Sequence, residues 1–117
     1  MQKPKKISYN DGILTIVVDK VKPNSFNAKT NSKKMSDFEI IGTLFYSEES
    51  KRHEDMLFAE SMNHKLTMKV KTNLVKGIKS NHKVIIDDYI YDIINTDIDK
   101  KNHELYFYLE GVRKIER

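Results

Sequence analysis

Apolar and polar positions alternate along much of this chain, most clearly between His82 and Glu110. A period of two places successive side chains on opposite faces, as in a β-strand. The pattern predicts three strands in this stretch, at 84–86, 89–96 and 104–110. Asp87-Asp88 favours a turn between the first two, and the charged run 97–102 separates the last two. We therefore expect a β-hairpin over Tyr89–Glu110 as the scaffold of the fold.

Three more strands are predicted before this stretch, at Ile13–Val18, Phe38–Tyr46 and Leu66–Thr72. The first, like strand 89–96, is apolar on both faces, which predicts burial on both sides or pairing within a barrel. Gly42 lies inside the second and predicts a β-bulge or a close approach of another backbone. Four side chains of that strand are expected to share one face: Phe38, Ile40, Leu44 and Tyr46. The third strand alternates cleanly, as an antiparallel strand with one solvated face does.

Two stretches lack this alternation. Periodicity disappears from Lys20 to Asp37, where proline, asparagine, serine and lysine accumulate, so a long loop is predicted. Around 48–61 the chain begins with serine and glutamate, contains good helix formers and carries apolar residues three apart, at Met56, Ala59 and Met62. This stretch predicts a short helix.

We therefore predict a mainly β fold, a small antiparallel β-barrel of about six strands. It carries one short helix, at about 48–61, and a long loop, at about 20–37. Residues 1–117 are expected to form a single domain, with an N-terminal arm at 1–11 and a basic C-terminal tail at 112–117.

The composition fits one small domain with one core. The chain has 117 residues, of which 38% are hydrophobic and 32% charged. A domain of this size buries only about two-thirds of its unfolded surface, so association with other subunits can supply further burial. The net charge of +4 and a pI near 9.2 suit a polyanion nearby, although the excess is small for a dedicated nucleic-acid-binding protein.

The chain shows no targeting pattern. Its first six residues are polar, and no segment approaches the roughly 18 apolar residues that span a bilayer. We expect the protein to be made and kept in a cytoplasm-like place, unless it leaves as part of an assembly.

No set of residues predicts catalysis, a cofactor or a metal. Cysteine is absent, and the four histidines lack the close pairing of a zinc-binding helix. The run 97–102 lacks the glycine and glutamate of a calcium loop. Paired carboxylates such as Asp87-Asp88 are adjacent, and adjacent side chains of a strand point to opposite faces. The sequence contains no glycine-rich phosphate loop or serine elbow. We expect a protein that is not an enzyme.

Two groups of lysines are candidates for contact with a partner. The loop group is the stronger candidate: Lys20, Lys22, Lys29, Lys33 and Lys34. The strand group is weaker: Lys65, Lys69 and Lys71. Each has an ordinary alternative, because a lysine-rich loop is often only a solvated connection, and a lysine row often only protects a sheet edge from aggregation.

The aromatic residues of the hairpin permit a second function. They are Tyr89, Tyr91, Tyr106, Phe107 and Tyr108. In a basic chain such residues can stack on single-stranded nucleic acid, so a small cytoplasmic nucleic-acid-binding β-barrel is the alternative hypothesis. Core packing is favoured, because Phe107 shares an inward face with Leu105 and Leu109.

The same C-terminal segments resemble a known family. HKVIID (82–87), YIYDIINTDID (89–99) and ELYFYLEGV (104–112) resemble the C-terminal half of the head-tail joining, or head closure, proteins of long-tailed bacteriophages. In that family a strand of the type V-x-x-x-x-x-Y-x-I precedes an aspartate-containing turn and a final strand rich in leucine and aromatic residues. Those places are taken here by Tyr91, Ile93, Asp97 and Leu105.

The resemblance extends upstream to about Gly42. GTLFYSEES, with Glu54 and Ala59, is similar to the middle segment of the family, and 65–72 to the strand that follows. Phe45-Tyr46 stands where the family commonly has a tryptophan.

The resemblance implies a small β-barrel with a short helix that forms a connector ring beneath the portal and adaptor of a DNA-filled capsid. Such a ring helps to retain packaged DNA and docks the tail. The implied partners are portal and adaptor proteins, the tail terminator, further copies of the chain, and non-specifically bound double-stranded DNA in the channel. The implied location is the head-tail interface of the virion, after synthesis in the bacterial cytoplasm, and no membrane is involved. Within this picture the loop Lys20–Asp37 is expected to become ordered on assembly, against a neighbouring subunit or the channel.

Overall fold

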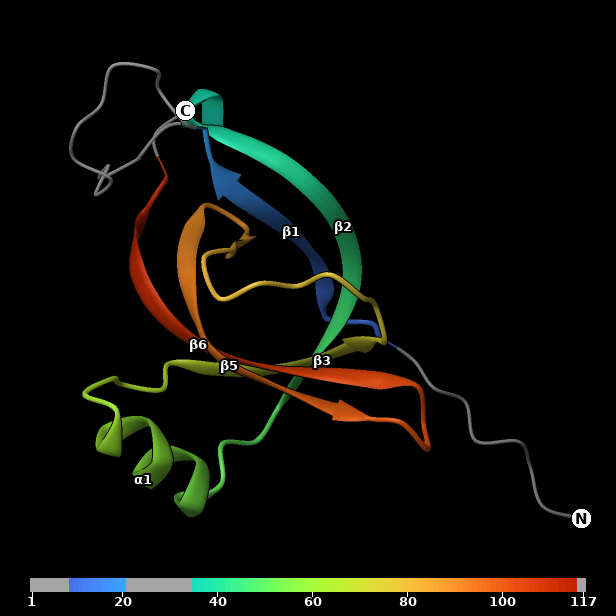
Figure 1. The fold of residues 1–117 in the computed structure, drawn as a ribbon, viewed down its shortest axis with the longest axis vertical. Helices are drawn as coiled ribbons and strands as arrows, with labels where there is room; N and C mark the ends of the chain where they lie inside the picture. Colours follow the sequence, from blue (N-terminus) through green and yellow to red (C-terminus); the bar gives the residue numbers. More distant parts are fainter. Residues whose placement is uncertain (1–8, 21–34, 116–117) are drawn as a thin grey trace, which may run out of the picture.

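A computed structural model of the chain describes residues 9–20 and 35–115. Six antiparallel strands form one sheet that closes into a ring in the order β1-β2-β3-β6-β5-β4 (Figure 1). The strands are β1 (Gly12–Asp19), β2 (Phe38–Glu49), β3 (Met68–Asn73), β4 (Lys83–Ile86), β5 (Tyr89–Asp99) and β6 (Glu104–Lys114). A 3-10 turn, η1 (Met35–Asp37), precedes β2, and a helix, α1 (His53–Ser61), connects β2 to β3. The prediction of a mainly β fold with one short helix is confirmed.

The predicted hairpin is the longest pairing in the described sheet. β5 and β6 pair from Tyr89↔Lys114 to Asp99↔Glu104. At its tip the Asp99 carboxylate accepts hydrogen bonds from the backbone N and the side-chain Nδ2 of Asn102, at 3.2 and 2.8 Å. The pairing continues beyond Glu110, so residues 112–114 of the expected C-terminal tail belong to β6. A strand partner therefore holds the start of that tail.

The main core fills the inside of the closed sheet. Phe107, Leu109, Val70 and Leu14 are fully buried there, as the alternation along their strands predicts. The remaining buried members are Ile16, Tyr46, Val84, Ile86, Tyr91 and Leu105. Side chains from all six strands pack in this core, so the core is complete only when the sheet is closed.

A second, smaller cluster lies on the opposite side of the sheet. Its buried members are Val17, Phe38, Ile85, Ile90 and Ile115, with Met35 of η1 packed against them. Because Val17, Ile85 and Ile90 alternate with residues of the main core, β1, β4 and β5 are buried locally on both faces. This explains the two-sided apolar runs and corrects the expectation of a single core.

Gly42 lies at a β-bulge, as predicted. In the pairing of β1 with β2, Ile16 faces Gly42 but Val17 faces Ile40, so Ile41 is the additional residue. The bulge changes which side chains face inward. Ile40 was expected to share a face with Leu44 and Tyr46, but Tyr46 is buried in the main core whereas Ile40 is 57% exposed.

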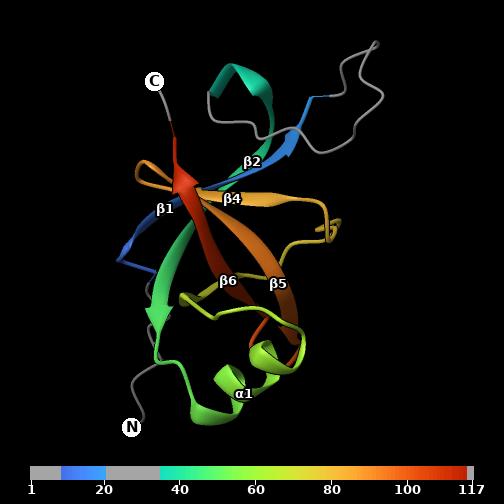
Figure 2. The ribbon, with the colours of Figure 1, turned by 90° about the vertical axis from the view of Figure 1, so that its left-hand side faces the viewer.

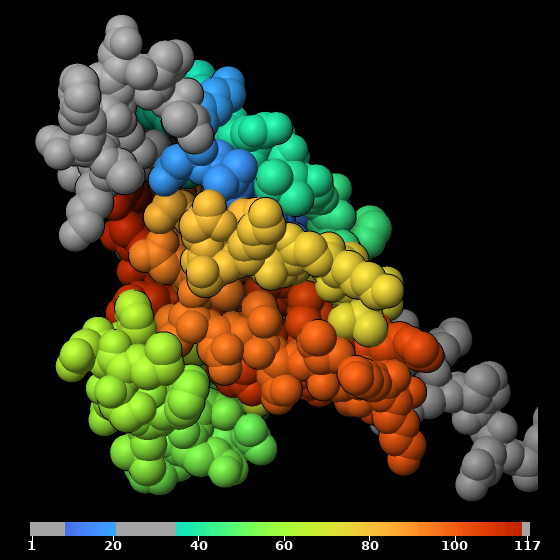
Figure 3. Space-filling model, viewed as in Figure 1, coloured from blue at the N-terminus to red at the C-terminus, as the bar shows by residue number. Residues whose placement is uncertain are grey.

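The helix is shorter than expected. Glu48 and Glu49 were predicted to begin it, but they extend β2 and pair with Val70 and Lys69 of β3. α1 begins after Arg52 and projects at one side of the sheet (Figures 2 and 3). No helix in the described ranges is long and apolar enough to cross a membrane.

Candidate interaction surface

Lys69 anchors α1 to the outer face of the sheet. Its Nζ lies 3.0 Å from Oδ2 of Asp55, and the two side chains are only 8% and 7% exposed. The same nitrogen lies 5.3 Å from the ring centroids of Tyr106 and Tyr108 on β6. The rings and the carboxylate together stabilise the buried ammonium group.

Arg52 completes this ion pair at the start of α1. Its backbone N and its Nε donate to Oδ2 of Asp55 at 3.1 and 3.2 Å, and its Nη2 donates to Oδ1 at 3.1 Å. Burial alone raises the pKa of Asp55, but the hydrogen bonds from Arg52 and Lys69 outweigh it and lower that pKa to about 2. Asp55 is therefore ionised at neutral pH and joins the first turn of the helix to β3. We call these three residues the Asp55 clamp.

Lys71 forms a second ion-pair network on the same face. Its Nζ lies 3.4 Å from Glu49 Oε1 and 3.6 Å from Glu104 Oε2. Tyr9 donates its hydroxyl hydrogen to Glu104 Oε2 at 2.8 Å, so the end of the expected N-terminal arm contacts β6. Burial, followed by the hydrogen bond to Glu104, raises the pKa of Tyr9 to about 12.

The segment between α1 and β3 is tied to β6. Nδ1 of His64 and Oε1 of Glu110 are 2.8 Å apart, and the backbone N of Lys65 donates to Glu110 Oε2 at 2.6 Å. The bond from the Lys65 backbone, followed by that from His64, lowers the pKa of Glu110. Contacts with the sheet therefore fix the segment after α1 as well as the first turn of the helix.

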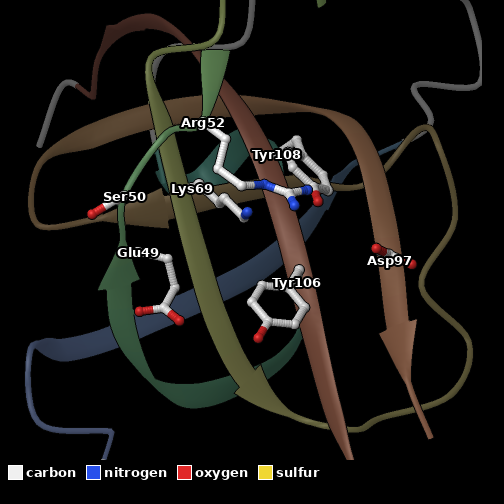
Figure 4. Close-up of a pocket in the computed structure, with 7 residues that line it drawn as sticks. All are labelled: Glu49, Ser50, Arg52, Lys69, Asp97, Tyr106 and Tyr108. Atoms are coloured by element: carbon white, nitrogen blue, oxygen red, sulfur yellow. The ribbon is translucent and has the colours of Figure 1, made fainter. Parts of the chain in front are cut away.

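A groove crosses this outer face beside the clamp. One part has a volume of about 470 Å³ and is lined by Glu49, Ser50, Arg52, Lys69, Asp97, Tyr106 and Tyr108 (Figure 4). A second part, of about 280 Å³, shares Asp97 and Tyr108 with the first and is also lined by Asp55 and Phe58 of α1. Figure 4 shows Glu49 of β2 and Asp97 of β5 on opposite sides of Arg52 and Lys69. The groove thus carries both acidic and basic groups, and its two cations, Arg52 and Lys69, already bind Asp55. This arrangement fits contact with a polar protein surface better than contact with phosphates.

The structure places only some of the predicted lysines. Lys20 is exposed at the end of β1, where its backbone N donates to the Asp37 carbonyl oxygen at 3.0 Å. Lys65 is exposed. Four loop lysines lie outside the described residues: Lys22, Lys29, Lys33 and Lys34.

The strand lysines are not a uniformly solvated row. Lys69 faces outward as predicted, but α1 and two tyrosine rings cover it, so the expectation of a solvated side chain is wrong there. Lys71 is partly buried between two carboxylates. A role for either lysine in binding a partner stays a prediction.

The hairpin aromatics do not form one continuous platform. Phe107 and Tyr91 are buried in the main core, whereas Tyr106 and Tyr108 line the outer groove. Tyr89 packs near Tyr91, with ring centroids 5.4 Å apart. Consecutive residues of β6 must face opposite sides of the sheet, which divides the aromatic run between the two faces. This favours the core-packing interpretation.

Arg52 and Asp55 were missed as interacting residues by the sequence analysis. Arg52 directly precedes α1, and Asp55 is an acidic residue three positions later, in the first turn of the helix. An acidic residue at this spacing is a recognisable signal for the start of a helix. Lys69 gives no such signal, because its partner becomes known only once α1 is placed against β3.

Metal ligands are not clustered in the part of the chain that the structure describes, where no group of three or more histidine, aspartate or glutamate side chains is suited to hold an ion. In comparisons with known proteins, no family model matches the chain and no curated protein is detectably similar to it. The resemblance to phage connector proteins therefore rests on the sequence of residues 42–112 alone.

Proposed function

We propose that this chain is a structural protein of a tailed-phage virion, a head closure or head-tail connector protein without enzymatic activity. In this role it forms a ring of subunits under the portal and adaptor complex, helps to retain the packaged DNA and docks the tail.

The observation that carries the proposal is the closed six-stranded sheet with a single helix between β2 and β3. This is the architecture that the resemblance of residues 42–112 implies. The fold alone does not specify a function, since small closed β-sheets serve many roles. The proposal therefore rests on the fold and the resemblance together.

The surface chemistry supports a role in protein contact. The outer groove combines mixed charges with tyrosines, a composition common at protein interfaces. Portal, adaptor and tail-terminator proteins are the proposed partners. The DNA contact is assigned to the loop lysines, of which Lys20 is at the described edge of the loop.

The test is a stop codon early in the gene, within the phage that encodes it. The expected particles are capsids that package DNA, lose it readily and carry no tails, alongside free tails in the same lysate. Electron micrographs count these particles, and nuclease digestion measures the released DNA. Purified protein added to a fresh lysate should restore tailed, infectious particles from the capsids that still hold DNA. Normal tailed virions from the stop-codon phage, with none of this chain found by mass spectrometry, would refute the proposal.

A further inference from the structure

A further pocket lies where the two connections of α1 meet β5 and β6. Its volume is about 390 Å³, which is within the range of small-molecule sites, and it shares no lining residue with the outer groove. Each connection supplies one lysine, Lys51 before the helix and Lys65 after it (Figure 2). The other lining residues are Leu66, Thr67, Tyr89, Tyr91 and Gly111. We call this site the lysine–tyrosine pocket.

The two lysines carry charge that the chain does not neutralise. Both are exposed, and neither forms an ion pair in the part of the chain that the structure describes. None of the described lining residues is a carboxylate. Glu110, next to Gly111, is already engaged, because its two oxygens lie 2.8 Å from Nδ1 of His64 and 2.6 Å from the backbone N of Lys65. The pocket therefore offers two cations to a ligand.

Hydroxyl groups add hydrogen-bond donors to the pocket. Oγ1 of Thr67 accepts a hydrogen bond from the backbone N of Gly111 at 2.9 Å, and its own hydrogen remains available to donate. Burial, followed by a neighbouring tyrosine and the carboxylates of Asp87 and Glu48, raises the pKa of Tyr91. Neither carboxylate lines the pocket, and the Tyr91 hydroxyl stays protonated at pH 8. The lining thus combines positive charge with neutral donors.

Gly111 shapes the apolar part of the pocket. A Cβ at this position would lie 3.0 Å from Cε1 of Tyr89, and 3.6 Å from both Cγ2 of Thr67 and Cε2 of Tyr91. The missing side chain therefore lets the Tyr89 ring approach the backbone of β6. That ring is 41% exposed, and its centroid lies 5.4 Å from that of Tyr91. A flat group that enters the pocket can stack on the exposed ring.

Contacts with the sheet hold both lysine-bearing connections in place. Lys51 directly precedes the Asp55 clamp, which joins the first connection to β3. In the second connection, the backbone N of Thr67 donates to the Leu109 carbonyl oxygen at 2.8 Å, two residues after Lys65. Because these contacts form without a ligand, binding orders little of the chain and loses little affinity to that ordering.

We propose that the lysine–tyrosine pocket binds a phosphate monoester carried on a flat aromatic group, the chemistry of a nucleotide. A phosphate monoester carries almost two negative charges at pH 8 and has three acceptor oxygens, which suits two ammonium groups and neighbouring hydroxyls. A carboxylate has a single charge and would leave one lysine without a partner. The exposed Tyr89 ring takes the aromatic group. The proposed virion role does not require this site, so the two are tested separately.

Titration of the full chain with thymidine monophosphate tests the pocket. At pH 8 and low salt, the backbone amide signals of Lys65, Thr67 and Gly111 should shift in NMR spectra, with a Kd below about 1 mM. Thymidine and inorganic phosphate each lack one part of the ligand, so each should bind about tenfold more weakly. Thymidine monophosphate that binds no more tightly than these two compounds, or that shifts amides elsewhere in the chain, would overturn the proposal.

A free nucleotide and the phosphorylated end of a DNA strand present the same chemistry. A 5′-phosphorylated thymidine tetranucleotide distinguishes them. Binding at least about tenfold tighter than that of the mononucleotide would support a strand end as the ligand, because further nucleotides then contact the protein. Equal affinity would support a free nucleotide.

Variants separate this pocket from general attraction between a basic protein and an anion. Lys51→Gln combined with Lys65→Gln should weaken binding of thymidine monophosphate about tenfold. The matched control combines Lys100→Gln with Lys101→Gln, two exposed lysines in the turn between β5 and β6, and should bind as the natural protein does. Equal losses in the two double variants would overturn the site.

A third variant tests the aromatic part of the pocket. Tyr89→Leu keeps an apolar side chain but removes the flat ring, so it should weaken binding of thymidine monophosphate and leave binding of inorganic phosphate unchanged. Circular dichroism checks that each variant is folded. Unchanged binding of thymidine monophosphate by Tyr89→Leu would contradict stacking on this ring.

Discussion

Lys69 Nζ and Asp55 Oδ2 form a 3.0 Å ion pair between β3 and α1, although both residues look like surface residues in the sequence. The pair explains how a nine-residue helix with only two buried residues keeps a fixed position. A helix of this length is marginal by itself in water, since helices below roughly 12 residues rarely form alone. The helix makes few apolar contacts with the sheet, so the ion pair supplies the tertiary contact that holds it in place.

Removing one member of this pair should therefore be costly. Lys69→Met leaves Asp55 buried with only Arg52 as its cationic partner, and we expect a loss of about 3 kcal/mol in the free energy of unfolding. Urea denaturation followed by circular dichroism measures it. Glu54→Gln is the matched control, because Glu54 is an exposed neighbour of Asp55 in the same helix turn and should change stability by less than about 0.5 kcal/mol. Similar losses for both variants would show that the buried pair has no special role.

The low pKa of Asp55 makes the clamp sensitive to acid. A pKa lowered from 3.8 to about 2 on folding stabilises the protein fully above pH 5, and the contribution is lost as the pH falls towards 2. Between pH 6 and pH 3 the loss from this group should be about 1 kcal/mol. Asp55→Asn cannot titrate, so its stability deficit relative to the natural protein should shrink by that amount. A deficit that stays constant from pH 6 to pH 3 would mean that Asp55 is not the titrating group.

Most of the strands were predictable because the evidence for them is local. Alternation shows directly in residues such as Leu105, Phe107 and Leu109, and the turn at Asp87-Asp88 follows from residue preference. The predicted start of the helix was wrong because of a tertiary contact. Glu48 and Glu49 are ordinary helix formers, but β3 lies beside them and pairs with their backbone, which outweighs the small difference in helix propensity.

The interaction surface was less predictable because its partners are distant in sequence. Tyr9 and Glu104 are 95 residues apart, and neither position is informative until the sheet closes. The outward direction of Lys69 followed from alternation, but its burial depends on the path of α1. Periodicity thus predicts which face a side chain occupies, and it does not predict what later covers that face.

The Tyr9 hydroxyl should contribute to stability through its bond to Glu104. Tyr9→Phe removes the donor and leaves a buried carboxylate with Lys71 as its remaining partner, so we expect a loss of about 1.5 kcal/mol. The raised pKa of Tyr9 sets the pH range, because the contribution is complete below pH 10 and is lost as the pH rises through about 12. Chemical denaturation at pH 8 measures the loss. Tyr89→Phe, at a more exposed tyrosine, is the control and should be close to neutral; equal losses for the two would argue against the Glu104 bond.

Phe107 and Phe45 should lose very different amounts of stability on truncation. Phe107 is fully buried in the main core, and Phe107→Ala should lower the free energy of unfolding by about 4 kcal/mol, because it removes apolar contacts and leaves a cavity. Phe45 is 64% exposed, so Phe45→Ala should cost less than about 1 kcal/mol in the monomer. Urea denaturation of both variants at low protein concentration tests the difference. A large loss for Phe45→Ala would mean that its exposed ring supports the sheet itself.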